Sequence, residues 1–392
     1  MHNFTYHAPT KVIFGKGSVD EVGNEVKKCG TGRALIVYGS DRICTSGLLG
    51  RIEKALDSSG ITHEAFGGVK ANPTLAHAEE GVRRALDFEA NMILAVGGGS
   101  AIDTAKGIAH GAANPEAALW DIWTGKKPLE KSLRTAAILT IPAAGSEMSD
   151  SAVLTNEEAG KKMGINTEFN RCAFAIMDPS LADSLPDWQL KNGIVDIMMH
   201  TMERYFIPDI KCDLTDTIAE GVLRTVRDNG RLVLLDRSDY DAMSEIWWAS
   251  SVSHNNLTEL GRGKDFSVHK IGMALSAKYD YTHGATLSAV WASWARYLYK
   301  DAIQRFAGYA RKVWGISTAD DRQAAILGIN ATENFFREIG MPTSLHELGL
   351  ENPSEEEIHA LALHATMDDT VKLSRIRPLS ASDIEKIYNS AM

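Results

Sequence analysis

The chain has 392 residues, of which 44% are hydrophobic and 23% charged, and its formal net charge is −10 at pH 7. This length favours two domains, and the acidic balance argues against broad nucleic-acid binding. No run of about 18 apolar residues suggests a membrane span. The first residues lack the basic and apolar blocks of a secretory signal, so we expect a cytoplasmic protein whose four cysteines stay reduced.

Short apolar runs alternate with helix-like segments in the first half. Four segments predict strands: ALIVYG at 34–39, NMILAVGGGS at 91–100, in which a glycine turn follows the strand, AAILTIPAAGS at 136–146 and AFAIMDPS at 173–180. The periodic stretch through Leu48, Ile52 and Leu56 predicts a helix, as does AIDTAKGIAHGAA after Ser100. Glycine-bounded apolar runs are typical of strands covered on both faces, with helices as crossovers. We expect an α/β dinucleotide-binding domain with a doubly wound, mainly parallel sheet.

The pattern changes after DPSLADSLP, residues 178–186, where long amphipathic stretches replace the apolar runs. We therefore predict two domains, an α/β domain over 1–181 and an all-helical domain over 182–392. No repeat or flexible linker separates the halves, so we expect them to pack tightly, with a ligand cleft between them.

A glycine-rich turn follows the second predicted strand in GGGSAIDTAK, residues 97–106. Gly97, Gly98 and Gly99 lack Cβ atoms, so backbone N–H groups can approach a phosphate, and the following helix adds its positive dipole end. The turn predicts a pyrophosphate cradle. A tight turn with Ser100 as N-cap and Asp103 completing a capping-box-like pair would give the same pattern.

An earlier turn, YGSDR, lies at the end of the first predicted strand. At this position a dinucleotide-binding fold distinguishes the ribose 2′-hydroxyl of NAD from the 2′-phosphate of NADP. Gly39 and Ser40 are small and Arg42 is a cation, which favours a 2′-phosphate, whereas Asp41 would repel one. A solvated pair between Asp41 and Arg42 is the alternative.

Asp196 and His200 stand four residues apart in the apolar stretch VDIMMHTMERY, so on a helix they share one face. An ordinary buried hydrogen bond would give the same pair. His269 and His283 follow in DFSVHKIGMALSAKYDYTHGATLS and complete a set of one oxygen and three nitrogen donors. That set suits Fe²⁺ or Zn²⁺, which would polarise an alcohol or carbonyl oxygen. The remaining histidines show no comparable grouping, and we expect most to be surface or structural residues.

The ordered motifs resemble the iron-containing (group III) alcohol dehydrogenase family, in its butanol dehydrogenase and NADPH-dependent aldehyde reductase branch. The matching segments cover nearly the whole chain: FGKGS from 14, GGGSAIDTAK, TIPAAGSEMSDSAVLT from 140, DPSL from 178, VDIMMHTMERY and the two-histidine segment. The resemblance implies an α/β dinucleotide domain, an all-helical domain, and a metal and nicotinamide that meet in the cleft.

The resemblance also implies residue roles. By motif match, the metal ligands are Asp196, His200, His269 and His283, and the pyrophosphate binders are Gly97, Gly98, Gly99 and Ser100. Asp103 and Thr140 fall at nucleotide-contacting positions, and Lys162 in GKKMG matches a lysine near the cofactor.

Two positions depart from the branch. Its ribose turn reads GGGS where this chain has GSDR, and we expect NADP(H) over NAD(H), with Arg42 beside the 2′-phosphate. Many relatives carry a histidine four residues after the third ligand where this chain has Met273, so we expect water or a ribose hydroxyl to carry the proton.

We therefore expect an NADP-favouring alcohol dehydrogenase or aldehyde reductase for short or medium-chain substrates such as butanol and butyraldehyde. The expected assembly is a homodimer, without nucleic-acid or membrane partners. One alternative is a dehydroquinate-synthase-like lyase that uses NAD and a metal. Another is a non-catalytic nucleotide-binding protein with a structural metal.

Overall fold

The computed structural model describes residues 1–208 and 210–392 and divides into two compact units. One unit is His7–Leu185; the other is Met1–Tyr6 together with Pro186–Met392. The first residues join the second unit through the His2 backbone N–H, which donates to the Gly261 carbonyl at 2.8 Å. We retain 1–181 and 182–392 as our proposed domain limits.

Unit His7–Leu185 is built on a six-stranded sheet in which every paired strand is parallel. The sheet order is β1-β8-β5-β4-β2-β3. The strands are β1 (Lys11–Phe14), β2 (Arg33–Tyr38), β3 (Thr62–Phe66), β4 (Met92–Gly97), β5 (Arg134–Leu139) and β8 (Phe174–Met177). The expected α/β dinucleotide fold is confirmed.

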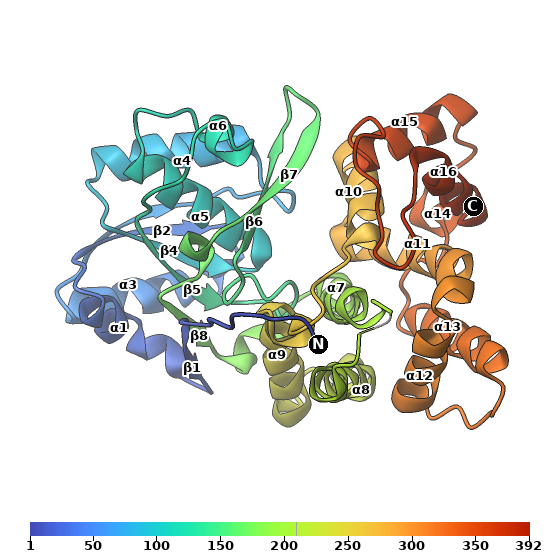
Figure 1. Ribbon diagram of the computed structural model, residues 1–392. Helices are drawn as coiled ribbons and strands as arrows, with labels where there is room; N and C mark the ends of the chain where they lie inside the picture. The colour runs from blue at the N-terminus through green and yellow to red at the C-terminus, as the bar shows by residue number, and fades with distance from the viewer. Residues whose placement is uncertain (209) are drawn as a thin grey trace. The chain divides into compact units, whose positions relative to one another are not determined.

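Helices cover both faces of this sheet, with α1 and α3 on one side and α4 and α5 on the other (Figure 1). The α helices of the unit are α1 (Val22–Lys28), α2 (Arg42–Thr45), α3 (Leu48–Ser58), α4 (Leu75–Asp87), α5 (Gly99–Ala113) and α6 (Leu119–Trp123). Short 3-10 turns lie at Ser18–Glu21, Glu168–Asn170 and Pro179–Ser184. The core between α3 and the sheet uses the predicted stripe Leu48, Ile52 and Leu56, and it confirms that helix.

An antiparallel hairpin, β6 (Ser151–Asn156) and β7 (Lys161–Asn166), follows β5. The predicted strand over 136–146 is too long, because β5 ends at Leu139 and the next residues form a loop. The strand and the following turn predicted within 91–100 are present, with β4 ending at Gly97 and α5 beginning at Gly99.

The connections between the strands create a switch point in this sheet. The chain passes from β2 outward to β3, returns to β4 on the other side of β2, and continues to β5. This reversal is a topological switch point, and ligands of open α/β sheets bind outside the carboxyl ends of the strands there. Tyr38 pairs with Val96 and Gly97 pairs with Leu139, so the residues that end β2, β4 and β5 are neighbours.

The second unit is helical, as the sequence predicts, with no named strand among its described residues. Its α helices are α7 (Asp187–Tyr205), α8 (Asp213–Leu235), α9 (Tyr240–His254), α10 (Ser267–Tyr279), α11 (His283–Leu298), α12 (Ile303–Trp314), α13 (Asp321–Glu338), α14 (Leu345–Leu348), α15 (Glu355–Ala365) and α16 (Ala381–Ser390). Short 3-10 turns lie at Leu257–Glu259 and Tyr299–Ala302.

Helix α7 is the central helix of this unit, because it is buried on all sides from Asn192 to Tyr205. It contacts α8, α9, α10 and α11, and a helix enclosed in this way carries apolar residues around its circumference. Ionisable groups on α7 must therefore find partners within the protein. Across the described residues, no helix has the length and apolar character needed to cross a bilayer.

Candidate metal centre and nucleotide-binding edge

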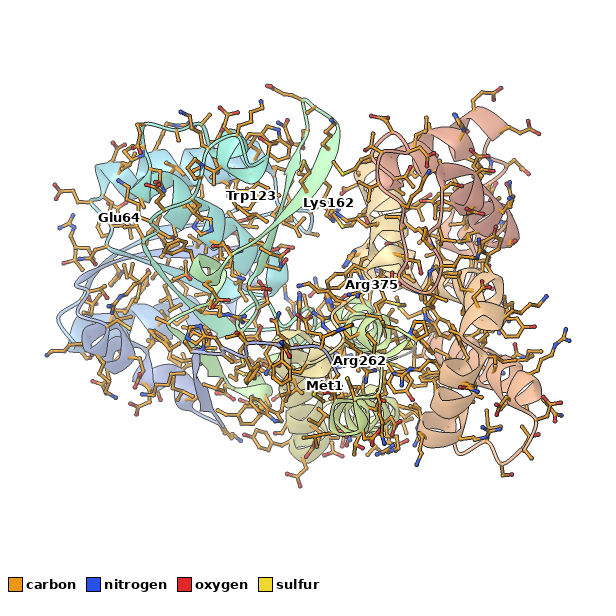
Figure 2. The ribbon with its side chains drawn as sticks, viewed as in Figure 1. Met1, Glu64, Trp123, Lys162, Arg262 and Arg375 are labelled. Carbon is orange, nitrogen blue, oxygen red and sulfur yellow. The ribbon has the colours of Figure 1, made fainter. Side chains whose placement is uncertain are left out.

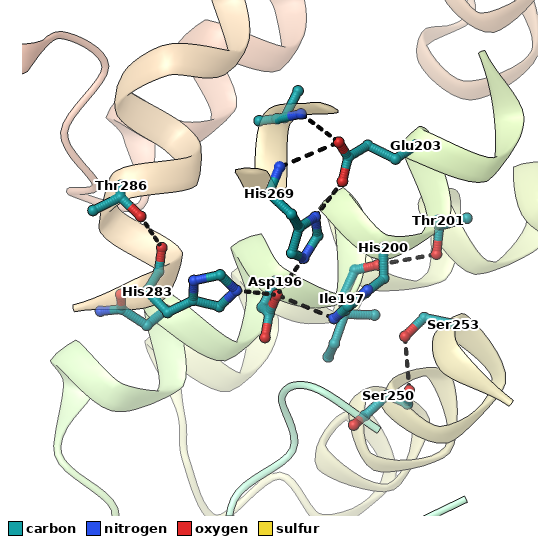
Figure 3. Close-up of polar contacts among 12 residues, drawn as sticks. Asp196, Ile197, His200, Thr201, Glu203, Ser250, Ser253, His269, His283 and Thr286 are labelled. Carbon is teal, nitrogen blue, oxygen red and sulfur yellow. Dashed lines mark hydrogen bonds and ion pairs between the residues drawn. The ribbon is translucent and has the colours of Figure 1, made fainter. Parts of the chain in front are cut away.

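Three imidazoles converge on one carboxylate oxygen in the helical unit (Figure 3). Asp196 and His200 lie one turn apart on α7, and Asp196 Oδ1 is 3.4 Å from His200 Nε2. The same oxygen is 3.5 Å from His269 Nε2, at the start of α10, and 3.7 Å from His283 Nε2, the first residue of α11. The structure thus brings together four residues that lie up to 87 positions apart.

The donor atoms of this cluster fit a divalent cation. Asp196, His200 and His269 are buried, and one ligand atom from each lies within 4.8 Å of the others. His283 falls outside that limit but keeps its contact with Asp196. His269 Nε2 is buried and has no hydrogen-bond partner among the described residues, although it faces the carboxylate. A set of one carboxylate and three imidazoles, of which Asp196, His200 and His269 are buried and His283 is partly exposed, is suited to Fe²⁺ or Zn²⁺.

The electrostatic environment shifts the pKa values of His200 and His269 in opposite directions. Burial holds the pKa of His200 well below its ordinary value, and the cationic forms of His254 and His269 add to that effect. Burial also disfavours the charged form of His269, but the Glu203 carboxylate and Asp196 outweigh it and raise the pKa to about 9. His200 is therefore neutral, whereas His269 would have to give up a proton to bind a cation.

Two further residues belong to this cluster and were missed by the sequence analysis. Glu203 Oε2 accepts a hydrogen bond from His269 Nδ1, the usual second partner of a metal-binding histidine. Its spacing was a usable signal, because Glu203 stands seven residues after Asp196 on the same face of α7. His254, expected among the surface or structural histidines, is buried and stacks on His200 with ring centroids 4.0 Å apart.

The predicted nucleotide residues gather at the switch point of the sheet. Gly39 follows β2, Gly97 ends β4, and Thr140 follows β5, where its backbone N–H donates to the Gly97 carbonyl at 3.1 Å. A side chain at Gly98 would collide with Ile141 Cγ2. The turn is therefore packed against the next loop, and it leaves backbone N–H groups at the N-terminus of α5 for an anion.

The capping-box alternative for this turn is wrong. Helix α5 begins at Gly99 with Gly98 as N-cap, so Ser100 already lies in the first turn. The Ser100 hydroxyl donates instead to the Ala71 carbonyl at 2.5 Å. Asp103 accepts from the Ser146 hydroxyl at 2.6 Å and from the Val153 backbone N–H at 2.9 Å.

The other predicted cofactor residues lie on neighbouring segments. Ser40, Asp41 and Arg42 lead from β2 into the short helix α2, with Asp41 as its N-cap. Lys162, labelled in Figure 2, lies on β7, and its Nζ donates to Asn72 Oδ1 at 2.8 Å. The 70–74 segment is thereby tied to both the hairpin and α5.

Comparisons with known proteins agree with this geometry. Residues 9–179 match the family model described as iron-containing alcohol dehydrogenase, and residues 191–392 match the C-terminal model of the same family. The chain is 35% identical to NADH-dependent butanol dehydrogenase A of Clostridium acetobutylicum and 30% identical to the NADPH-dependent aldehyde reductase YqhD of Escherichia coli, each over 100% of both chains.

Solved structures are similar over the same extent. The crystal structure of NADH-dependent butanol dehydrogenase A from Thermotoga maritima superposes with a TM-score of 0.95 at 32% identity, covering 100% of this chain and 99% of that one. The Escherichia coli YqhD structure gives a TM-score of 0.94 at 30% identity, with the same coverage.

Proposed function

The chain belongs to the iron-containing alcohol dehydrogenase family, an oxidoreductase family acting on alcohols and aldehydes, and from this premise we propose its reaction. The reaction is reversible hydride transfer between NADP(H) and a short or medium-chain aldehyde or alcohol, such as butyraldehyde or butanol. The convergence of three imidazoles on Asp196 Oδ1 is the observation that carries this proposal. The names of the relatives, butanol dehydrogenase and aldehyde reductase, support the substrate class.

We propose that Asp196, His200, His269 and His283 hold one divalent cation, Fe²⁺ or Zn²⁺. Such a cation supplies a Lewis acid that polarises an alcohol or carbonyl oxygen and lowers the pKa of the alcohol. The one carboxylate leaves the bound cation with one net positive charge. The apolar surroundings of α7 keep Asp196 and His200 buried, which strengthens the electrostatic interactions of these two residues.

We propose that the switch point of the sheet holds the dinucleotide. Gly97, Gly98, Gly99 and Ser100 offer backbone N–H groups to the pyrophosphate, and Thr140 and Lys162 lie on segments tied to that turn. A nicotinamide held there would supply the hydride donor or acceptor. Met273 lies one turn after His269 on α10 and cannot relay a proton, so water or a ribose hydroxyl carries it.

The choice of NADP(H) over NAD(H) rests on the turn after β2. Gly39 carries no side chain to accept from a 2′-hydroxyl, and Arg42 supplies a cation for a 2′-phosphate. Asp41 opposes this preference, and among the relatives described above a butanol dehydrogenase carries the NADH name and YqhD the NADPH name. We propose that Arg42 outweighs Asp41.

The test is steady-state reduction of butyraldehyde by the purified protein with NADPH and with NADH. We expect turnover with both, and a higher kcat/KM for NADPH. A higher kcat/KM for NADH would overturn the NADP(H) proposal and leave the reaction standing. Absence of turnover with either coenzyme would favour the lyase or the non-catalytic alternative. Light scattering of the same sample tests our proposal of a homodimer.

A further inference from the structure

Helix α7 presents four polar side chains on one face, of which two are the first metal ligands. Asn192, Asp196, His200 and Glu203 are separated by four, four and three residues, which places them within an arc of about 80° on an α-helix. All four are buried, and Asn192 and Glu203 lie on either side of the ligand pair. The roles of Asn192 and Glu203 are set by what they contact.

Glu203 contacts the first turn of α10. Its Oε1 accepts the backbone N–H of Val268 at 2.5 Å and that of His269 at 3.2 Å, and its Oε2 accepts His269 Nδ1 (Figure 3). The N–H of Ser267 donates to Asp265 at 2.9 Å. The N-cap of α10, Phe266, makes no side-chain capping bond, so a carboxylate from α7 satisfies donors that the helix leaves open.

Asn192 contacts the first turn of α11 in the same manner. Its Oδ1 accepts the backbone N–H of Ala285 at 2.8 Å, and the N-cap of α11, Thr282, makes no side-chain capping bond. A Cβ at Gly284 would lie 2.5 Å from the Asn192 carbonyl oxygen and 2.8 Å from its Cα, so only glycine allows this approach. The Asn192 amide group donates to the Trp188 carbonyl at 2.6 Å, which fixes its orientation.

Each cap thus belongs to a helix whose first turn carries a metal ligand. His269 is the third residue of α10, and His283 is the first residue of α11. Both helices start on α7, and both imidazoles point at the Asp196 carboxylate that lies between the two caps. Contacts from α7, the helix that carries Asp196 and His200, therefore set the positions of His269 and His283.

We propose that Asn192 and Glu203 are positioning residues that seat the starts of α11 and α10, and with them His283 and His269, at the metal site. Glu203 has a second effect, because a carboxylate only accepts hydrogen bonds. The carboxylate holds a proton on His269 Nδ1, which leaves Nε2, the nitrogen that faces Asp196, to bind a cation. The inference rests on the proposed function only in taking these histidines as metal ligands.

The test compares metal affinity in matched variants, measured by Zn²⁺ competition with a chromophoric chelator and without substrate or coenzyme. Glu203→Gln keeps an oxygen for the two backbone N–H groups but presents an amide donor to His269 Nδ1, so the imidazole proton moves to Nε2. Asn192→Ala removes the cap of α11, whereas Asn192→Asp keeps an acceptor. Glu220→Gln is the control, because Glu220 accepts from the Tyr205 hydroxyl, away from the ligands.

We expect Glu203→Gln and Asn192→Ala to weaken Zn²⁺ binding about 10–100-fold, the usual effect of losing an outer partner of a metal ligand. Asn192→Asp and Glu220→Gln should bind within about 3-fold of wild type, a difference near RT. The Tm of each metal-free protein shows whether a variant affects the stability of the fold and not the positions of the metal ligands. Lower Tm values with unchanged Zn²⁺ affinity in Glu203→Gln and Asn192→Ala would overturn the inference. Failure of the wild type itself to bind Zn²⁺ would overturn the proposed function instead.

Discussion

Asp103 is expected to hold the first turn of α5 against the segments that carry Ser146 and Val153, and its loss should destabilise the protein. Lys106 is fully buried, and its Nζ donates to the Ser146 carbonyl at 2.8 Å, the Ser146 hydroxyl at 2.9 Å and the Ser151 carbonyl at 2.7 Å. Three acceptors require three N–H groups, so the lysine is an ammonium ion. Burial lowers the pKa of Lys106, and the Asp103 carboxylate opposes that shift.

The magnitude follows from removing one of two buried opposite charges, which are linked through the Ser146 hydroxyl that accepts from Lys106 Nζ and donates to Asp103. Asp103→Asn keeps the shape, deprives Lys106 of its counter-charge and turns an amide donor toward Ser146 or Val153, which should cost about 3–5 kcal/mol of unfolding free energy. Lys106→Met should cost a similar amount. The double variant removes both charges and should cost clearly less than the sum of the single variants.

The assay is equilibrium urea unfolding by far-UV circular dichroism, together with the KM for NADPH. The family resemblance implies a different role for Asp103, that of a nucleotide contact. Neutral surface substitutions change the unfolding free energy by less than about 0.5 kcal/mol. If Asp103→Asn stays within that range and raises only the KM for NADPH, then the stabilising role of Asp103 is refuted. An additive double-mutant cycle would refute the coupling between the two residues.

Three other perturbations test separate parts of the account. His269→Ala should lower metal-dependent turnover more than about 100-fold, since even outer-shell partners of metal ligands cost 10–100-fold; normal turnover in a folded variant would remove His269 from the site. Arg42→Ala should raise the KM for NADPH about 10-fold, the loss of one charge-assisted hydrogen bond, and leave the KM for NADH unchanged; equal effects would exclude a contact with the 2′-phosphate. Burial lowers the pKa of His110 to about 4, so its neutral form stabilises the fold above pH 6.5, and that stability is lost as the pH falls from 6.5 towards 4. Between pH 7 and pH 5 the wild type should lose about 2 kcal/mol more unfolding free energy than His110→Gln, and parallel urea profiles would contradict this.

The sequence predicted the local features of the metal site because they depend on helix geometry. The four-residue spacing of Asp196 and His200 within an apolar stretch placed both on one buried face of α7. Glu203 follows at a compatible spacing, but its role depends on where α10 begins, 64 residues later in the chain. The spacing places Glu203 on the face of the ligands, but it does not show that the carboxylate caps another helix.

The same reasoning explains the errors in the first unit. The edge strands β1 and β3 were not predicted, because β1 has only four residues and Thr62–Phe66 places three polar residues before Ala and Phe, so neither carries a long apolar run. The capping-box alternative assumed that Ser100 precedes α5. The helix begins two residues earlier, since Gly98 and Gly99 pack against Ile141 and Ala144, a contact made by a distant loop. Tertiary packing, which the local pattern does not contain, decided both cases.

The most direct test of the metal centre is to strip the purified protein with a chelator and follow butyraldehyde reduction by NADPH while Fe²⁺ or Zn²⁺ is added back anaerobically. Recovery of turnover at one equivalent of metal per chain, absent in His269→Ala, is the result that this account predicts. Full turnover in the stripped protein, or recovery that His269→Ala shares with the wild type, would contradict the assignment of Asp196, His200, His269 and His283 as the ligands of a catalytic metal.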